Sequence, residues 1–141
     1  MAKLLRVGDH VLTRNLQGGG LAFHPILKVH HNPPSPTFAV KLAGETIVSS
    51  PFHRFWKAGK GWAMARDLKV GDVVRVLEGT ATVEAVEAGG TQPVFNLDVA
   101  EDHDFFAGSA GALVHDNTLP DLRLAPFDAA PTPTLAKATK P

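Results

Sequence analysis

The sequence contains no cysteine. This absence excludes disulfides, thiolate metal sites and a cysteine nucleophile within the 141 residues. An excess of charge is also missing: 14 Lys and Arg residues balance 14 Asp and Glu residues, so no overall field favours nucleic acid or a membrane surface. No apolar run is long enough to cross a bilayer, and no secretory signal opens the chain. We expect a cytoplasmic monomer as given, without nucleic-acid or membrane partners.

The residues that are abundant predict a β domain. Thirteen glycines and eleven prolines, separated by valine-rich alternation, favour short strands and many turns over helices. Turns are expected where these residues cluster, including residues 33–36 and 89–90, and one short helical turn is expected over residues 64–68. The predicted strands cover residues 11–14, 22–30, 37–42, 45–50, 73–77, 81–87, 93–99 and 112–115.

One phrase occurs twice in the chain. Leu-Arg-Val-Gly-Asp-His-Val at residues 5–11 recurs as Leu-Lys-Val-Gly-Asp-Val-Val at residues 68–74. In each copy the Gly-Asp pair predicts a turn closed by the Asp side chain, and the following valine begins a strand. A second echo relates the His-Arg-Phe that begins at His53 to the His-Asp-Phe that begins at His103. We therefore expect two duplicated halves, with a site where they meet.

Two blocks of motifs resemble the Hint family, which includes inteins, Hedgehog autoprocessing domains and bacterial pretoxin domains. The central block reads Ser-Pro-Phe-His-Arg-Phe-Trp from Ser50, then Gly-Lys-Gly-Trp, then Leu-Lys-Val-Gly-Asp. The closing block reads Val-Phe-Asn-Leu-Asp-Val, then Asp-His-Asp-Phe-Phe, then Gly-Ala-Leu-Val-His, ending at His115. Their order over residues 5–117 is most similar to pretoxin Hint domains. The resemblance implies an all-β horseshoe of short antiparallel strands with pseudo-twofold duplication.

The resemblance also implies self-processing. In this family a Cys or Ser at the first position of the domain attacks the preceding carbonyl, an N-to-S or N-to-O acyl shift that leads to self-cleavage or splicing. The departing amide nitrogen needs a general acid and the oxyanion needs donors. His53 matches the histidine that protonates this nitrogen, and Ser50 stands where the family usually has Thr, with a hydroxyl that orients the scissile peptide. No cofactor or metal is implied.

The second half carries the matches for the later steps. Asp102 and His103 match the block that assists them, and His115 matches the histidine that polarises the final carbonyl while an Asn cyclises. Asp116 occupies the expected Asn position, and an ionised Asp offers no amide nitrogen to close a succinimide. A shifted register would use Asn117, with the hydroxyl of Thr118 beyond it. Both registers remain open at this point.

The first strand of the family pattern has no match. There is no Cys, and no Ser precedes Ser35. We expect residues 1–117 to form a Hint-like domain that lacks its first strand and is incomplete or inactive as given. An upstream strand with a nucleophile would restore single-turnover processing in cis. The partners would be the flanking segments of the polypeptide itself, such as a toxin or extein, and the parent protein would be secreted or surface-associated.

Residues 118–141 have a different character. Their prolines leave no room for a strand or helix, so we expect a flexible tail or linker. Leu122, Leu124 and Phe127 are the residues expected to touch the domain.

Non-catalytic alternatives stay open. His53 and His103 are also explained as half-buried histidines near strand ends, and Ser50 as a strand-end hydroxyl. The whole chain is also explained as a β scaffold or linker module of a larger polypeptide. A metal site at His30 and His31 is not expected, because adjacent residues on a strand point to opposite faces.

Overall fold

The computed structural model describes residues 5–120 and 126–128 and is almost entirely antiparallel β sheet. The elements are β1 (His10–Arg14), β2 (Leu21–Leu42), β3 (Glu45–Ser49), β4 (Arg54–Lys57), β5 (Gly61–Met64), the 3-10 turn η1 (Ala65–Asp67), β6 (Val73–Val76), β7 (Gly79–Val99), β8 (Asp104–Ala107) and β9 (Ala112–His115). Within the described residues no helix has the length and hydropathy needed to span a membrane.

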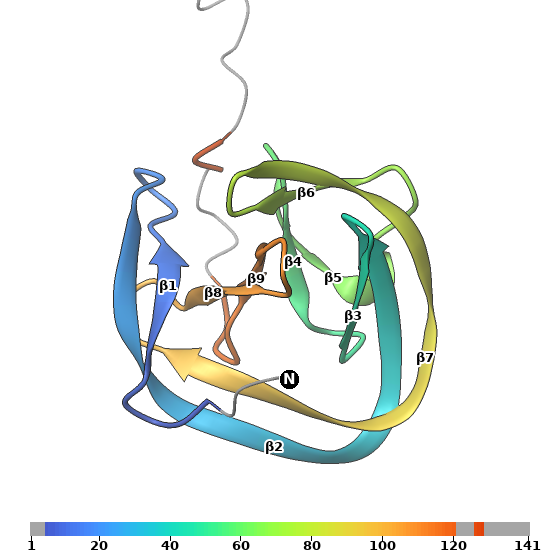
Figure 1. The fold of residues 1–141 in the computed structure, drawn as a ribbon, viewed down its shortest axis with the longest axis horizontal. Helices are drawn as coiled ribbons and strands as arrows, with labels where there is room; N and C mark the ends of the chain where they lie inside the picture. Colours follow the sequence, from blue (N-terminus) through green and yellow to red (C-terminus); the bar gives the residue numbers. More distant parts are fainter. Residues whose placement is uncertain (1–4, 121–125, 129–141) are drawn as a thin grey trace, which may run out of the picture.

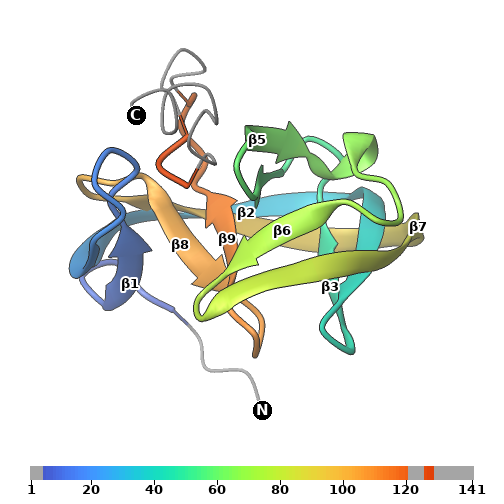
Figure 2. The same cartoon turned by 90° about the horizontal axis from the view of Figure 1, so that it is seen from above.

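Two long strands give the molecule its horseshoe outline. β2 and β7 pair with each other and curve around the short strands, which lie inside the curve (Figure 1). The sheet runs β1-β2-β7-β6-β4-β9-β8, with β3 added to β2 and β5 added to β4. The view from above shows β8 and β9 crossing the space between the long strands (Figure 2). The predicted all-β horseshoe fold is therefore confirmed.

The duplicated phrase forms two turns with the same hydrogen bonds. In the first, the amide of Gly8 donates to the carbonyl of Ile26, and the Asp9 carboxylate accepts from the amide three residues earlier. In the second, the amide of Gly71 donates to the carbonyl of Val83, and the Asp72 carboxylate again accepts from three residues earlier. Both glycines have φ near +95°, at +94° and +97°, where a side chain would be strained. The predicted Asp-closed turns are confirmed.

Two turns were predicted where the chain in fact continues as strand. Residues 33–36 lie within β2 and residues 89–90 lie within β7, with bulges in the pairing between Asn32 and Ser35 and between Thr37 and Phe38. The prolines are tolerated because β2 pairs only with β7 over this stretch, and Pro33 and Pro34 lie in the irregularity of that pairing, so fewer N–H groups are needed there. At Gly89 a Cβ would lie 2.5 Å from the hydroxyl of Thr37, so the bend needs glycine.

Three strands were missed because their alternation is hidden. In β4 the consecutive residues Phe55 and Trp56 are both buried, so no polar face marks the strand. β5 and β8 are equally short, with four residues each. The helical turn predicted over residues 64–68 is present as η1.

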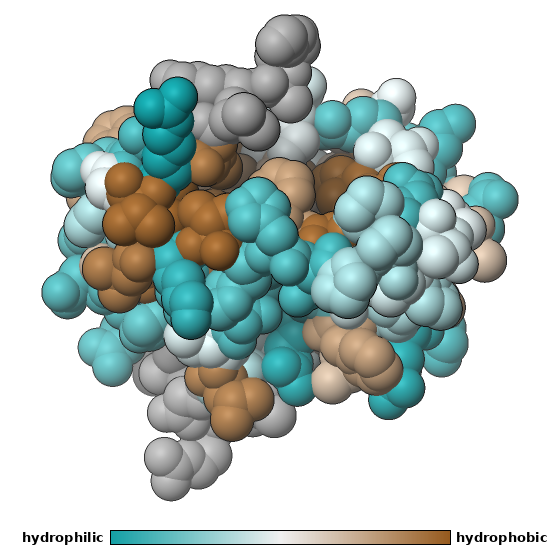
Figure 3. Space-filling view, turned by 90° about the horizontal axis from the view of Figure 1, so that it is seen from below, coloured by the Kyte–Doolittle hydropathy of each residue, from teal (hydrophilic) through white to brown (hydrophobic). Residues whose placement is uncertain are grey.

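The apolar interior has two parts. A larger cluster includes Val40, Leu42, Phe55 and Val114, and a smaller one consists of Ile26, Leu97 and Val99, while Phe105 of β8 packs against both. Apolar side chains also reach the surface: on the face in Figure 3 they form separate groups with hydrophilic residues between them. The ring of Phe105 thus joins the two halves of the core at the centre of the horseshoe.

Candidate functional site

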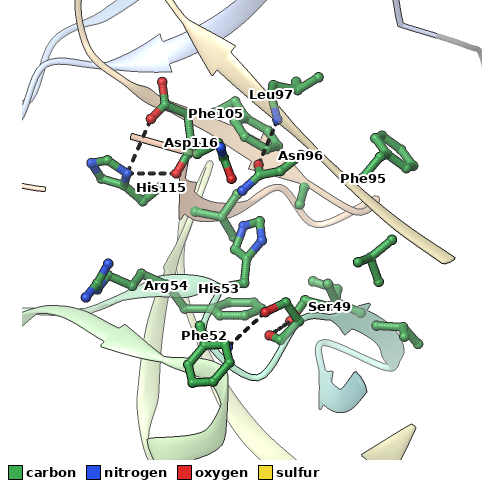
Figure 4. Close-up of a pocket in the computed structure, with 18 of the residues that line it drawn as sticks. Ser49, Phe52, His53, Arg54, Phe95, Asn96, Leu97, Phe105, His115 and Asp116 are labelled. Carbon is green, nitrogen blue, oxygen red and sulfur yellow. Dashed lines mark hydrogen bonds and ion pairs between the residues drawn. The ribbon is translucent and has the colours of Figure 1, made fainter. Parts of the chain in front are cut away.

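A cavity of about 790 Å³ lies between β3, β7, β8 and the segment that follows β9 (Figure 4). Ser50, His53, His115 and Asn117 all line it. Leu5, the first residue that the structure describes, lines it too. Residues near the beginning of the domain and residues near its end therefore line the same cavity.

His53 presents an unsatisfied nitrogen at this cavity. The residue follows β3 in a turn closed by its amide on the carbonyl of Ser50, and its ring meets the edge of Phe105 at a centroid distance of 6.4 Å. Its ring points into the cavity in Figure 4. Nε2 is buried and has no hydrogen-bond partner among the described residues. Burial, and to a smaller degree the nearby His115, lower the pKa of His53 to about 4, so the ring is neutral at pH 7.

Ser50 shapes the turn that carries His53. Its Oγ accepts a hydrogen bond from the amide of Phe52 at 3.0 Å. That bond uses the oxygen and leaves the hydroxyl proton free to be donated.

His115 polarises a particular carbonyl. Its Nδ1 lies 3.0 Å from the backbone oxygen of Asp116, so the ring donates an N–H to the peptide bond between residues 116 and 117. The other side of the ring packs edge-on against Trp62 at 4.9 Å. Burial lowers the pKa of His115, which keeps the ring neutral at pH 7. The polarised carbonyl belongs to Asp116, as in the first of the two registers open from the sequence.

The carboxylate of Asp116 is held by several donors. One oxygen accepts from the amide of Val99 at 2.8 Å and from His103 Nδ1 at 3.1 Å. The other accepts from both the amide and the hydroxyl of Thr118, at 2.8 and 2.5 Å. The side chain has no exposed surface. Asp116 therefore fixes the last turn of the domain against β7.

The structure does not bring His103 and Asp102 into the cavity. His103 takes the position before β8 that His53 takes before β4, but its φ of +55° turns it outward, and its ring is half exposed. It reaches the site through Asp116. The carboxylate of Asp102 accepts from the hydroxyl of Thr13 at 2.6 Å and lies 3.5 Å from His24, so it faces β1 and β2.

Several site features could not be read from the sequence. From the sequence, Asp116 was only a departure from the expected Asn. Its carboxylate holds the end of the domain by accepting a hydrogen bond from the amide of Val99, which lies 17 residues away in sequence. Leu5 and Asn96 also line the cavity. Each stands in a motif described above, but neither motif indicates that these side chains border the site. Among the described residues no three His, Asp or Glu side chains are grouped in a way that could hold a metal ion.

The fold is shared with solved intein and intein-like domains. An intein-like domain from Clostridium thermocellum is 24% identical, with a TM-score of 0.74, 79% of this chain covered and 83% of that one. A DnaB intein from Synechocystis sp. PCC 6803 is 20% identical, with a TM-score of 0.73 and coverage of 80% and 82%. A DnaX mini intein from Spirulina platensis is 22% identical, with a TM-score of 0.63 and coverage of 79% and 88%. At these identities the likeness shows the fold, which is the Hint/intein fold.

The family follows from the sequence match. The pretoxin HINT domain family matches residues 2–117, most of the chain. The chain therefore belongs to this family, and it is an autoprocessing-type domain in the general sense that the family defines. The comparison with curated proteins found no match.

Proposed function

We propose that this domain cuts or rearranges its own polypeptide at a junction seated in the cavity of His53. The supporting observation is that Leu5, His53 and Asn117 line one cavity. A domain that acts on its own backbone must bring its flanks to a single set of catalytic groups, because positioning converts the reaction into a unimolecular step. The substrate is thus the polypeptide that flanks residues 1–117, with a toxin or extein attached.

In this proposal His53 moves the proton at the upstream junction. A Cys or Ser joined upstream of the chain attacks the carbonyl that precedes it, and the C–N bond breaks as a thioester or ester forms. Neutral Nε2 takes the proton of the nucleophile and then gives it to the departing amide nitrogen. The lowered pKa suits both roles, since the ring is unprotonated at pH 7 and its imidazolium form is a strong donor.

The other cavity residues act on the peptide. The free hydroxyl proton of Ser50 is donated to the scissile peptide and orients it. At the downstream junction His115 polarises the carbonyl of Asp116. In this proposal a water molecule adds to that carbon, the C–N bond to Asn117 breaks, and a carboxylic acid on residue 116 and a free amine on Asn117 are formed. His103 acts there as a positioning residue, because its ring hydrogen-bonds to the Asp116 carboxylate and does not line the cavity. The attacking Cys or Ser is not among residues 1–34, so in this proposal residues 1–141 alone form no product at the upstream junction.

The proposal is tested by extending the chain upstream. A short reporter peptide ending in Cys or Ser is fused before residue 1, and cleaved or ligated products are followed by mass spectrometry. We expect product from the extended chain and a loss of at least ~100-fold in rate for His53→Ala, because general acid–base groups contribute about that much or more.

The matched control is His10→Ala, which removes an exposed histidine of β1 outside the cavity and should leave the rate unchanged. A folded extended chain that yields no product, or a His53→Ala variant as fast as the parent, would contradict the proposal. The first of these outcomes would favour the non-catalytic scaffold.

A further inference from the structure

A short piece of the chain beyond the domain is seated in a built socket. Phe127 stacks on Trp56 with ring centroids 5.4 Å apart. The guanidinium groups of Arg14 and Arg75 lie over the same ring, at 5.2 and 5.7 Å from its centroid. Gly19 lies beneath it, where an added Cβ would come within 3.1 Å of the ring. Phe127 therefore fills a site made of an aromatic ring, two cations and a glycine.

Asp128 makes the polar half of the same contact. One carboxylate oxygen accepts from the indole Nε1 of Trp56 at 3.0 Å and from the amide of Gly59 at 2.9 Å. The other oxygen accepts two charge-assisted hydrogen bonds from Arg75, from Nε at 3.0 Å and from one terminal nitrogen at 2.8 Å. The Asp128 side chain is only 6% exposed. Each of the two carboxylate oxygens therefore accepts two hydrogen bonds from the domain.

The socket draws on both duplicated halves. Arg14 and Gly19 belong to the β1–β2 hairpin, and with Trp56 and Gly59 they precede the second copy of the duplicated phrase, whereas Arg75 of β6 follows it. In Figure 2 the red segment that carries Phe127 lies between this hairpin and β5. The predicted contact of Phe127 with the domain is confirmed, while Leu122 and Leu124 lie outside the described residues.

We propose that Phe127 and Asp128 form an intramolecular anchor, which docks the polypeptide following the domain in this socket and releases it once the chain between Asp116 and Pro126 is cut. The proposal rests on the proposed function only for the nature of the natural cut. While the chain is continuous, a short connection gives an effective concentration in the millimolar range. Two anchoring residues bury far less surface than a stable interface, so a separated fragment at micromolar concentration dissociates.

The anchor would also tether the junction from both sides. Upstream of the junction, Asp116 is clamped to β7, and downstream, Phe127 and Asp128 hold the flank at the opposite end of the connection. Because both ends are tethered, the two flanks stay close together while the bond is intact. Once the bond is broken, the connection no longer limits their separation. The socket thus couples release of the flank to cleavage.

An external protease tests the anchor without relying on self-processing. A factor Xa recognition sequence replaces residues 121–124 in the full chain, and His53→Ala is included to suppress any internal reaction. Before the cut we expect this variant to have the same melting midpoint as the parent chain. After the cut at micromolar concentration we expect the fragment to leave in size-exclusion chromatography and the midpoint to fall by roughly 5 °C. A millimolar synthetic peptide covering residues 125–141 should restore it.

Variants identify the groups responsible. Phe127→Ala and Asp128→Asn in the uncut chain should lower the midpoint about as far as the cut does, and the Phe127→Ala peptide should not rescue the cut domain. Phe23→Ala, at a phenylalanine of β2 that is 66% exposed, is the matched control and should have little effect. Co-elution of the cut fragment, or uncut variants that melt like the parent, would overturn the anchor whether or not the domain processes itself.

Discussion

Asp104→Asn should abolish a decline in stability that we expect for the parent domain between pH 6.5 and 8. The side chain of Asp104 is buried at the start of β8, where one oxygen accepts from the amide of Arg14 at 2.9 Å and the other has no partner among the described residues. Burial above all, with smaller contributions from Asp102 and Asp116, raises the pKa of this carboxyl to about 8.

The sign of the effect follows from proton binding. Between the unfolded value of 3.8 and the folded value of about 8, the folded domain keeps a proton that the unfolded chain has lost. Stability therefore falls with rising pH by about 1.4 kcal/mol per unit, or about 2 kcal/mol from pH 6.5 to 8, and levels off about one unit above the folded pKa. Below pH 6.5 the lowered pKa values of His53 and His115 act in the opposite direction, since those rings resist protonation in the fold.

Urea unfolding at a series of pH values measures this dependence. Asn keeps the acceptor for Arg14 and cannot ionise, so the variant should be level from pH 6.5 to 8 and more stable than the parent above pH 8. Asp98→Asn, which changes a carboxylate paired with His30 and about a quarter exposed, should retain the decline. Parallel profiles for the parent and Asp104→Asn would refute the assignment of the decline to Asp104.

Asp116→Ala should destabilise the domain by about 2–6 kcal/mol. The carboxylate is the acceptor for the backbone amides of Val99 and Thr118, and it lies where the side chain has no exposure to water. Its removal leaves two amides without partners, and each unsatisfied buried group costs about 1–3 kcal/mol. The expected result is a large drop in the urea midpoint with an unchanged slope.

Asp116→Asn is the matched variant, because it keeps the size of the side chain and one acceptor oxygen but turns an NH2 group toward a donor. We expect a smaller loss than for Ala. His103→Ala should cost less than either, since the His103 ring is half exposed and makes a hydrogen bond to the carboxylate. If the free energy of unfolding of Asp116→Ala lies within 1 kcal/mol of that of the parent, the Asp116 carboxylate does not hold the last turn of the domain against β7.

The features that were predictable from sequence are local ones. The Val-Gly-Asp turns are closed by hydrogen bonds between residues three apart, so the motif alone defines them. The strand over residues 112–115 matches β9, because turn residues bound it closely. The prolines over residues 33–36 predicted a turn, and that prediction was wrong. Whether a missing N–H interrupts a strand depends on which strand lies beside it in the sheet.

The candidate site was partly accessible in the same way. Ser50 and His53 lie in one short turn, and the order of motifs placed His115 and Asn117 beside them, which is where the structure has all four. The outward turn of His103 depends on its backbone angles, and the position of Asp102 depends on its contact with Thr13 of β1. The sequence similarity between the segments at His53 and His103 does not contain this information.

By itself the sequence determined the duplicated β architecture and the family, because repeats, turns and motif order are properties of the chain. Only the tertiary structure decided which carbonyl His115 faces, that Asp104 is held away from water and that Phe127 meets both halves. Those properties depend on contacts between residues distant in sequence and on the loss of solvent around them, and neither exists before the chain folds.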